Sequence, residues 1–204
     1  MKKLNSMLIF ATIFICVSAL LCSCTNDTKK PTQSVYISYN VDDNKVIDKC
    51  SDIISKRLDL AGYKNTVTTN SNKIEVTFKA ESTSDDFQSI LSMAGDFSIT
   101  GECDISLTKD DIKTAKAIKD DNGNNVIELS FTKDGKRKFA TLTEKSSFTK
   151  ISLDDKICSP STHGRMEVDS ILITGFMNDE LTEEKAKFYA AIIMSDKLPC
   201  SLTY

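Results

Sequence analysis

Three hydrophobicity patterns follow one another along the chain. Residues 8–21 are almost continuously apolar, polar residues then dominate up to Gln33, and strand-like and helix-like patterns alternate over the remainder. The apolar residues at positions 35, 37 and 39 recur every second residue, as in a strand, and residues 46–61 carry an apolar stripe at helical spacing. The chain therefore predicts a leader, a short tether and a folded region that mixes helices and strands.

The first 23 residues have the features of a bacterial lipoprotein signal peptide. Two lysines precede the apolar run, and the string L-C-S-C at 21–24 fits a cleavage box that ends in a lipidated cysteine. We expect removal of residues 1–23, acylation of Cys24, for example with palmitate, and a polar tether over 24–33. Cys22 fits less well because a large leucine precedes it. A plain secretory leader or an uncleaved membrane anchor is the alternative. The lipid anchor predicts a location on the outer face of the bacterial cytoplasmic membrane.

Residues 34–101 predict a ferredoxin-like base with the element order βαββαβ. After the first strand and helix, alternating apolar residues predict strands near Val67 and over 74–78. A helix over 87–94 and a strand over 97–99 complete the order. This order is typical of an antiparallel sheet with both helices on one face, and it predicts the α+β class.

Residues 102–204 predict a second, head-like unit with a mixed or antiparallel sheet. Strands over 112–119 and 126–131 flank an Asn-Gly turn, which we prefer to a calcium loop because apolar residues fall at its first and twelfth ligand positions. The elements that follow are a helix capped by Thr132, a hairpin over 150–159, a strand over 170–175, a helix capped by Thr182 and a closing strand over 198–202.

Several strings in this order resemble the first periplasmic (extracytoplasmic) domain of SecD and SecDF, the protein-export membrane components, and in particular its head subdomain. They are L-D-D-K-I-C-S-P at 153–160, I-T-G at 173–175, T-E-E-K-A-K at 182–187 and I-I-M-S-D-K-L-P at 192–199, with weaker similarity at 55–62 and 131–143. Asp155 and Asp196 stand where the family usually has Gly, which predicts turns in a backbone region that Asp adopts less readily.

The resemblance implies a non-catalytic domain that binds extended secreted polypeptides or components of the Sec translocon. Such binding would use an apolar groove or an exposed sheet edge. The candidate contact residues are Phe176, Phe188 and Tyr189 and the hairpin residues Ile157 and Pro160. Burial of the aromatic residues in the core is the alternative, and we expect it for Phe188. A cell-surface binding module whose partner is unrelated to export is the second functional hypothesis.

Composition and charge exclude several other function classes. The net charge is -3, and removal of a leader that contains two lysines and no acid takes it to -5, which argues against nucleic-acid binding. His163 is the only histidine and lies in a polar loop, and neither a G-x-S-x-G nor a C-x-x-C string occurs. We therefore expect no enzyme activity, metal, cofactor or small-molecule substrate. No segment after the leader is apolar enough to span a membrane, so the chain is not expected to be a proton-driven motor by itself.

Four cysteines remain after Cys24. Cys50, Cys103, Cys158 and Cys200 are an even number in a compartment that permits disulfides, and they allow three pairings. Four buried thiols that act as small apolar side chains are equally consistent with the sequence.

Overall fold

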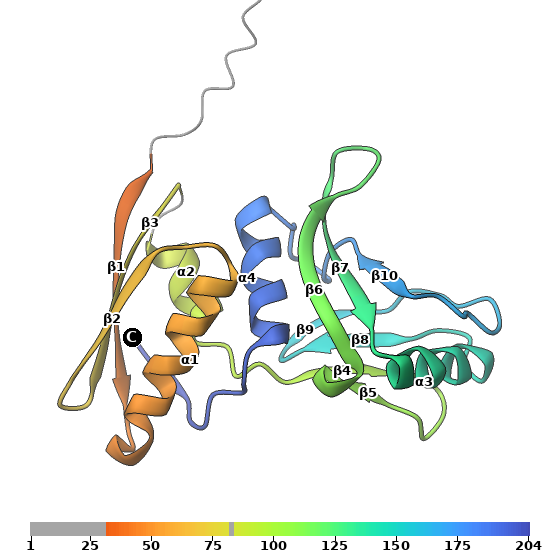
Figure 1. Ribbon diagram of the computed structural model, residues 1–204, viewed down its shortest axis with the longest axis horizontal. Coiled ribbons are helices and arrows are strands. Elements are labelled where there is room, and N and C mark those ends of the chain that lie inside the picture. Colours follow the sequence, from red (N-terminus) through yellow and green to blue (C-terminus); the bar gives the residue numbers. More distant parts are fainter. Residues whose placement is uncertain (1–31, 82–83) are drawn as a thin grey trace, which may run out of the picture. The chain divides into compact units, whose positions relative to one another are not determined.

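An antiparallel four-stranded sheet joins the beginning of the folded region to the end of the chain. The computed structural model describes residues 32–81 and 84–204, so the predicted leader and the lipidation site Cys24 lie outside the described residues. The strand order of this first sheet is β11-β1-β3-β2 (Figure 1). Its strands are β1 (Gln33–Val41), β2 (Asn65–Asn70), β3 (Lys73–Ala80) and β11 (Leu202–Thr203).

The two faces of the first sheet differ because its side chains alternate. In β1, Val35, Ile37 and Tyr39 are buried, whereas Tyr36 between them is 56% exposed. Helix α1 (Ile47–Leu60) contacts β2 and β3, and helix α2 (Ser84–Leu91) contacts β1. Both helices lie on the same side of the sheet (Figure 1). The apolar stripe of α1 thus covers the apolar face of the sheet, as amphipathic patterns require.

One edge strand of the first sheet, the one next to β1, is not the strand that the sequence pattern predicts. The strand expected over 97–99 does form, as β4 (Phe97–Thr100), but it pairs with β5 and β8 in another sheet. Strand β11 instead pairs with β1, and it occupies the fourth position of the ferredoxin-like arrangement. Alternation of apolar residues predicts that a segment is a strand, whereas its partner depends on packing with distant parts of the chain.

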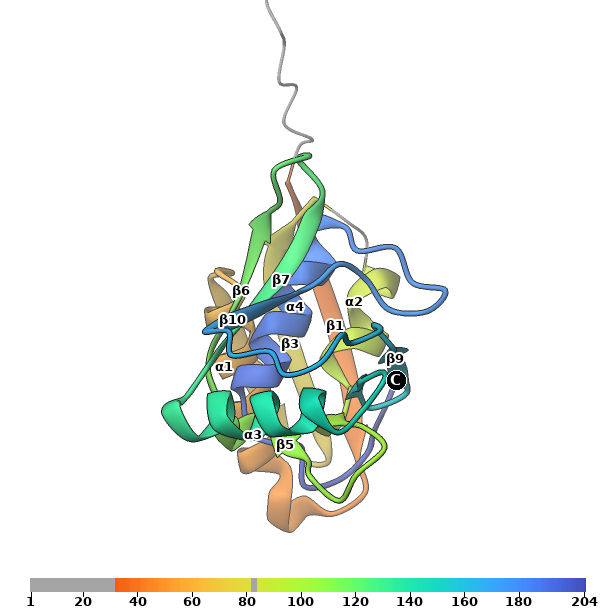
Figure 2. The same ribbon diagram turned by 90° about the vertical axis from the view of Figure 1, so that its right-hand side faces the viewer.

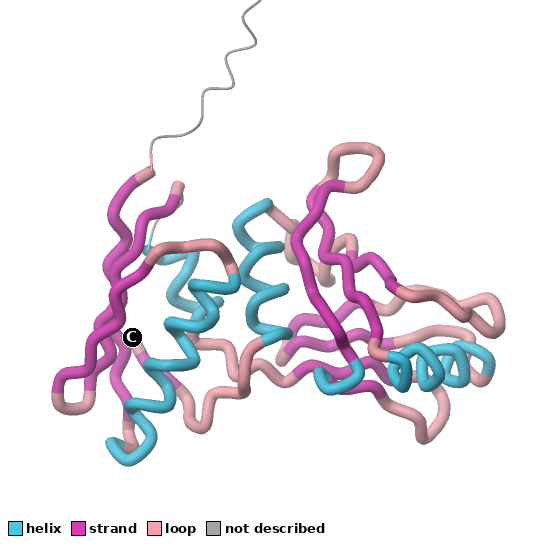
Figure 3. Tube along the Cα trace, in the orientation of Figure 1, coloured by secondary structure: helices cyan, strands magenta, loops and turns pink. Residues whose placement is uncertain are grey.

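The remaining strands form two further sheets, both antiparallel (Figure 3). One has the order β5-β4-β8-β9 and the other β10-β7-β6. Their remaining strands are β5 (Leu107–Thr108), β6 (Ile112–Lys119), β7 (Asn125–Phe131), β8 (Lys150–Leu153), β9 (Lys156–Cys158) and β10 (Ser170–Ile173). Helix α3 (Lys133–Glu144) follows β7 and is capped by Thr132, as predicted.

Helix α4 (Glu183–Met194) is buried nearly all around. Seven of its residues are buried, and the helix contacts α1 and α2 as well as β6 and β7. Figures 1 and 2 show it between the first sheet's helices and the β10-β7-β6 sheet. A helix without a polar face is stable only when other elements cover it on several sides. The Thr182 side chain accepts a hydrogen bond from Lys185 N, so the predicted N-cap is confirmed.

The α+β class predicted from the sequence is confirmed by these helices and antiparallel sheets. The predicted division into residues 34–101 and 102–204 stays a prediction; residues 32–204 form one compact unit. The turn expectation for Asp155 and Asp196 is wrong, because neither residue has a positive φ; in the hairpin turn the left-handed residue is Asp154, at φ 53°. Its carboxylate accepts hydrogen bonds from Gly95 N and Asp96 N, which compensates for the less favourable conformation.

Candidate functional site

The predicted contact residues of the hairpin lie at its surface. Ile157 on β9 is half-buried and Pro160 is exposed. Pairing continues past Pro160, because its carbonyl accepts a hydrogen bond from Thr149 N and Phe148 forms a bridge with Ser161. The Phe148 side chain is 44% exposed. This end of the hairpin therefore presents apolar side chains to solvent.

The three predicted aromatic contacts are buried instead. Phe176 and Tyr189 pack edge to face, with ring centroids 5.4 Å apart. Phe188 is fully buried and stacks on Tyr63 at 5.1 Å, within a cluster that also contains Phe78 and Phe87. These residues thus form core in the described structure, which agrees with the alternative kept for them. Direct contact between a partner and these rings stays a prediction that requires the core to open.

A carboxylate whose side chain is only 9% exposed, that of Asp179, fixes the loop before α4. Asp179 accepts hydrogen bonds from the Tyr189 hydroxyl and from Lys185 Nζ, both at 2.5 Å, and Lys156 Nζ lies 3.7 Å away. Burial by itself would raise the pKa of Asp179, but the bonds from Lys185 and Tyr189 and the two lysine charges outweigh it and lower that pKa. Burial of the Tyr189 hydroxyl, together with its hydrogen bond to Asp179 and the charge of that carboxylate, raises the pKa of Tyr189. The loop is therefore held to α4 and to β9 by one ionised side chain.

We expect Asp179→Asn to lower the free energy of unfolding by about 1 to 3 kcal/mol at pH 7, because it removes charge-assisted hydrogen bonds. A lowered folded-state pKa stabilises the fold above the unfolded-state pKa, and this contribution disappears as pH falls through the folded-state value. Urea unfolding should thus show the difference shrinking as pH falls from about 5 toward 2. Asp169→Asn is the matched control, since that side chain is 91% exposed. A pH-independent difference would contradict the prediction.

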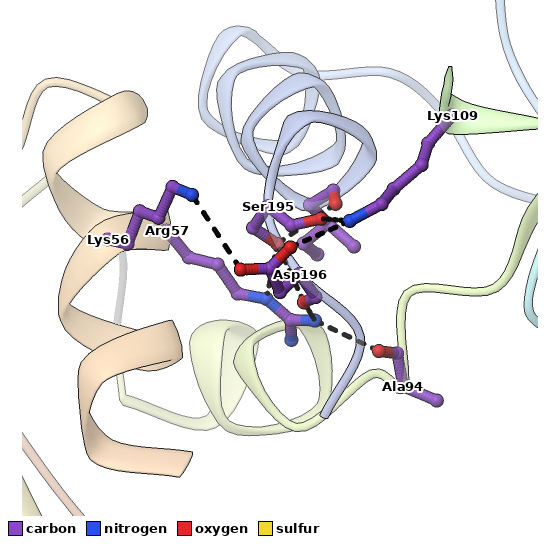
Figure 4. Close-up of polar contacts among 7 residues, drawn as sticks. Lys56, Arg57, Ala94, Lys109, Ser195 and Asp196 are labelled. Atoms are coloured by element: carbon purple, nitrogen blue, oxygen red, sulfur yellow. Dashed lines mark hydrogen bonds and ion pairs between the residues drawn. The ribbon is translucent and has the colours of Figure 1, made fainter. Parts of the chain in front are cut away.

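A buried arginine joins three segments that are distant in sequence (Figure 4). Arg57 on α1 is fully buried, and its Nε donates to Ser195 Oγ at 3.0 Å. Its two terminal nitrogens donate to carbonyl oxygens of Leu91, Met93, Ala94 and Asp196. All five donors of the guanidinium are thus satisfied. The Arg57 cluster, as we name Arg57 with these acceptors, fixes both crossovers between the first sheet and the rest of the fold.

Electrostatics and close packing support the Arg57 cluster. Burial lowers the pKa of Arg57 to about 10, which leaves it charged at neutral pH. A Cβ at Gly95 would lie 2.9 Å from the guanidinium, so glycine permits this approach. Outside the buried part, the Asp196 carboxylate pairs with Lys109 at 2.8 Å and with Lys56 at 3.9 Å. The sequence pattern did not single out Arg57, although a charge on the apolar stripe of a helix was the available signal.

Strand β10 and the segment that follows it expose large apolar side chains. Strand β10 is an edge strand of its sheet, and Leu172 at its middle is 48% exposed. Met177, which follows shortly after β10, is 68% exposed. Strand β9 is also an edge strand, but at Ile157 its backbone is already used, because the Ile157 carbonyl accepts a hydrogen bond from Met177 N. We name β10 with Leu172 and Met177 the β10 edge.

The sequence also drew attention to His163 and to the four cysteines after Cys24. His163 is exposed, with its Nδ1 2.9 Å from the Thr162 carbonyl. Within residues 32–81 and 84–204, no group of three or more histidines, cysteines or acidic residues is arranged to hold a metal ion. Helices of this same part of the chain are too short or too polar to cross a membrane. Cys50, Cys103, Cys158 and Cys200 are all free thiols.

Comparisons with known proteins find relatives both in sequence and in structure. No family model matches the chain. The protein translocase subunit SecD of Acidaminococcus fermentans is 28% identical over 167 residues, which cover 78% of this chain and 39% of SecD. This chain thus spans well under half of that relative.

The solved structures share the fold. SecDF in its super-membrane-facing form aligns with a TM-score of 0.60 and 17% identity, over 85% of this chain and 30% of that chain. A second SecDF structure, of a membrane component that enhances protein export, aligns with a TM-score of 0.54 and 16% identity, over 82% of this chain and 96% of that chain. The resemblance found in the sequence motifs is therefore confirmed: the chain is similar to SecD in sequence and has the fold of a periplasmic domain of SecDF.

Proposed function

We propose that this chain is a lipid-anchored, extracytoplasmic, non-catalytic protein that binds extended segments of secreted polypeptides beside the Sec translocon. The observation that carries the proposal is the 28% identity to SecD over 167 residues. A solved relative of the same fold is a membrane component that enhances protein export. The lipoprotein box at Cys24 supports attachment to the outer face of the membrane by acyl chains.

The β10 edge is the proposed binding surface. An edge strand carries unpaired backbone donors and acceptors on one side, and an extended polypeptide can add to it as a further strand. Such binding does not depend on the sequence of the added strand, because the backbone supplies the hydrogen bonds. Leu172 would then contact the neighbouring side chains of the bound segment, as cross-strand neighbours do. This mode suits a protein that meets many different secreted chains.

We expect Leu172→Glu to lower the recovery of crosslinked secreted polypeptides about tenfold, because burial of one leucine contributes about 1.5 kcal/mol or more and a charge opposes it. The measurement is chemical crosslinking of the full chain in its own membranes, followed by mass spectrometry. Leu60→Glu is the matched control, since Leu60 is 50% exposed on α1. Cys24→Ala should remove the protein from the membrane fraction and abolish recovery of translocon subunits.

Two outcomes would contradict the proposal. Recovery of one unrelated surface protein, without translocon subunits or secreted chains, would favour the alternative of a general cell-surface binding module. Equal losses of crosslinked secreted polypeptides in Leu172→Glu and Leu60→Glu would show that the β10 edge is not the binding surface.

A further inference from the structure

Two cysteines far apart in sequence meet in the fold. Cys50 Sγ and Cys200 Sγ lie 3.5 Å apart, although 150 residues separate them. Cys50 is buried on α1, and Cys200 is half-buried just before β11. We infer that Cys50 and Cys200 form a disulfide when the protein meets a small or protein disulfide as oxidant outside the cytoplasm. The bond needs the sulfurs to approach from 3.5 Å to about 2.05 Å.

The chain between α4 and β11 is held along α1 at two points. Cys50 and Arg57 are seven residues apart, or two helical turns, and so they share one face of α1. Arg57 binds Ser195 and Asp196 at the start of this segment, and Cys50 meets Cys200 near its end. The segment therefore runs antiparallel to α1. The contacts of Arg57 with the start of the segment thus help to bring Cys200 next to Cys50 near its end.

The remaining two cysteines have other surroundings. Cys103 Sγ lies 3.9 Å from Ser146 Oγ, and Cys158 is half-buried on β9, where burial raises its pKa to about 11. Of the four cysteines that the structure describes, Cys50 and Cys200 alone make a sulfur–sulfur contact. The geometry thus selects the Cys50–Cys200 pair from the pairings that the sequence allows, and it leaves Cys103 and Cys158 as thiols.

Exposure sets the order of the two exchange steps. The Cys200 thiolate attacks one sulfur of the oxidant's disulfide, and the oxidant's other sulfur leaves as a thiolate. The Cys50 thiolate then attacks Cys200 Sγ in this mixed disulfide, and the second thiolate of the oxidant leaves. Two electrons pass to the oxidant, and the two protons released by the cysteines go to its thiolates through solvent. Burial is the largest cause that raises the pKa of the Cys50 thiol, and it persists in the mixed disulfide, so the second step should accelerate as pH rises.

The disulfide would secure a short strand. Strand β11 pairs with β1 only at Asn40–Thr203 and Val41–Leu202. A covalent bond two residues upstream of β11 would hold it in register after the ladder opens. The oxidised protein would therefore keep the end of its chain on the first sheet under conditions that release it in the reduced protein.

The test uses the purified full chain, first reduced and then incubated with an excess of oxidised glutathione. The chain is unfolded in urea so that buried thiols are accessible, free thiols are blocked with iodoacetamide, and the chain is digested without reduction for mass spectrometry. We expect loss of Cys50 and Cys200 from the alkylated residues and a peptide that links them, with Cys103 and Cys158 still alkylated. The Cys103→Ala/Cys158→Ala double variant should give the same linked peptide. Cys200→Ala should return Cys50 to the alkylated residues after denaturation.

Links that involve Cys103 or Cys158 as the main product, or alkylated Cys50 and Cys200 in excess oxidant, would overturn the inference. The inference depends on the proposed function only for the compartment in which the oxidant is met. A second sample, acid-quenched directly from cells, tests the proposed location separately from the cysteine pairing. A linked pair in cells supports both proposals, whereas a pair that links in the purified chain but is reduced in cells contradicts the extracytoplasmic location and leaves the pairing supported.

Discussion

Replacement of Arg57 by alanine is expected to lower the free energy of unfolding by about 3 to 5 kcal/mol. The change removes five donors at once and leaves the Ser195 hydroxyl and several buried carbonyl oxygens without their partner. Each buried acceptor that loses its donor costs about 1 to 3 kcal/mol, and water entering the vacated space recovers part of this cost. Because small domains are stable by only about 5 to 15 kcal/mol, the urea midpoint should fall strongly.

Two variants sharpen this test. Arg57→Lys keeps the charge but has a single nitrogen with three donors, so we expect an intermediate loss. Arg137→Ala is the matched control, since that side chain is 73% exposed and pairs with Asp134, and surface pairs contribute about 0 to 1 kcal/mol. A midpoint shift in Arg57→Ala no larger than that in Arg137→Ala would contradict a structural role for the Arg57 cluster.

The elements of the fold could be predicted because their signals are local. Thr182 caps α4 and Thr132 caps α3, and each bond joins residues three apart in sequence. The strands β6 and β7 follow from alternation, and the turn between them from its Asn and Gly residues. Such features depend on neighbours within a few residues, which a single sequence displays.

The contacts that organise the molecule could not be predicted in the same way. One partner of β4 is β8, about 50 residues later, and the first sheet takes one of its edge strands from the end of the chain. The acceptors of Arg57 are mostly backbone carbonyls, which carry no sequence signal. The sequence likewise allowed three cysteine pairings, because no local signal chooses among them, and only the fold brings Cys50 to Cys200. Tertiary packing decides these contacts.

Replacement of Phe188 by alanine is expected to lower the free energy of unfolding by about 3 to 5 kcal/mol, as large-to-small changes at fully buried aromatic residues do. Its ring stacks on Tyr63 and lies 5.1 Å from Phe87, so the change removes buried area, leaves a cavity and breaks aromatic pairs. Phe188→Leu should cost less because it fills most of the volume.

The comparison with exposed residues decides whether Phe188 is core or contact. Phe148→Ala should change the urea midpoint little, because that ring is 44% exposed. If Phe188 serves only packing, Phe188→Leu should leave crosslinking to secreted polypeptides unchanged at a temperature where the variant is fully folded, whereas Leu172→Glu should reduce it. If folded Phe188→Leu loses crosslinking as strongly as Leu172→Glu, the aromatic cluster must open to meet the partner, and the β10 edge would not by itself account for binding.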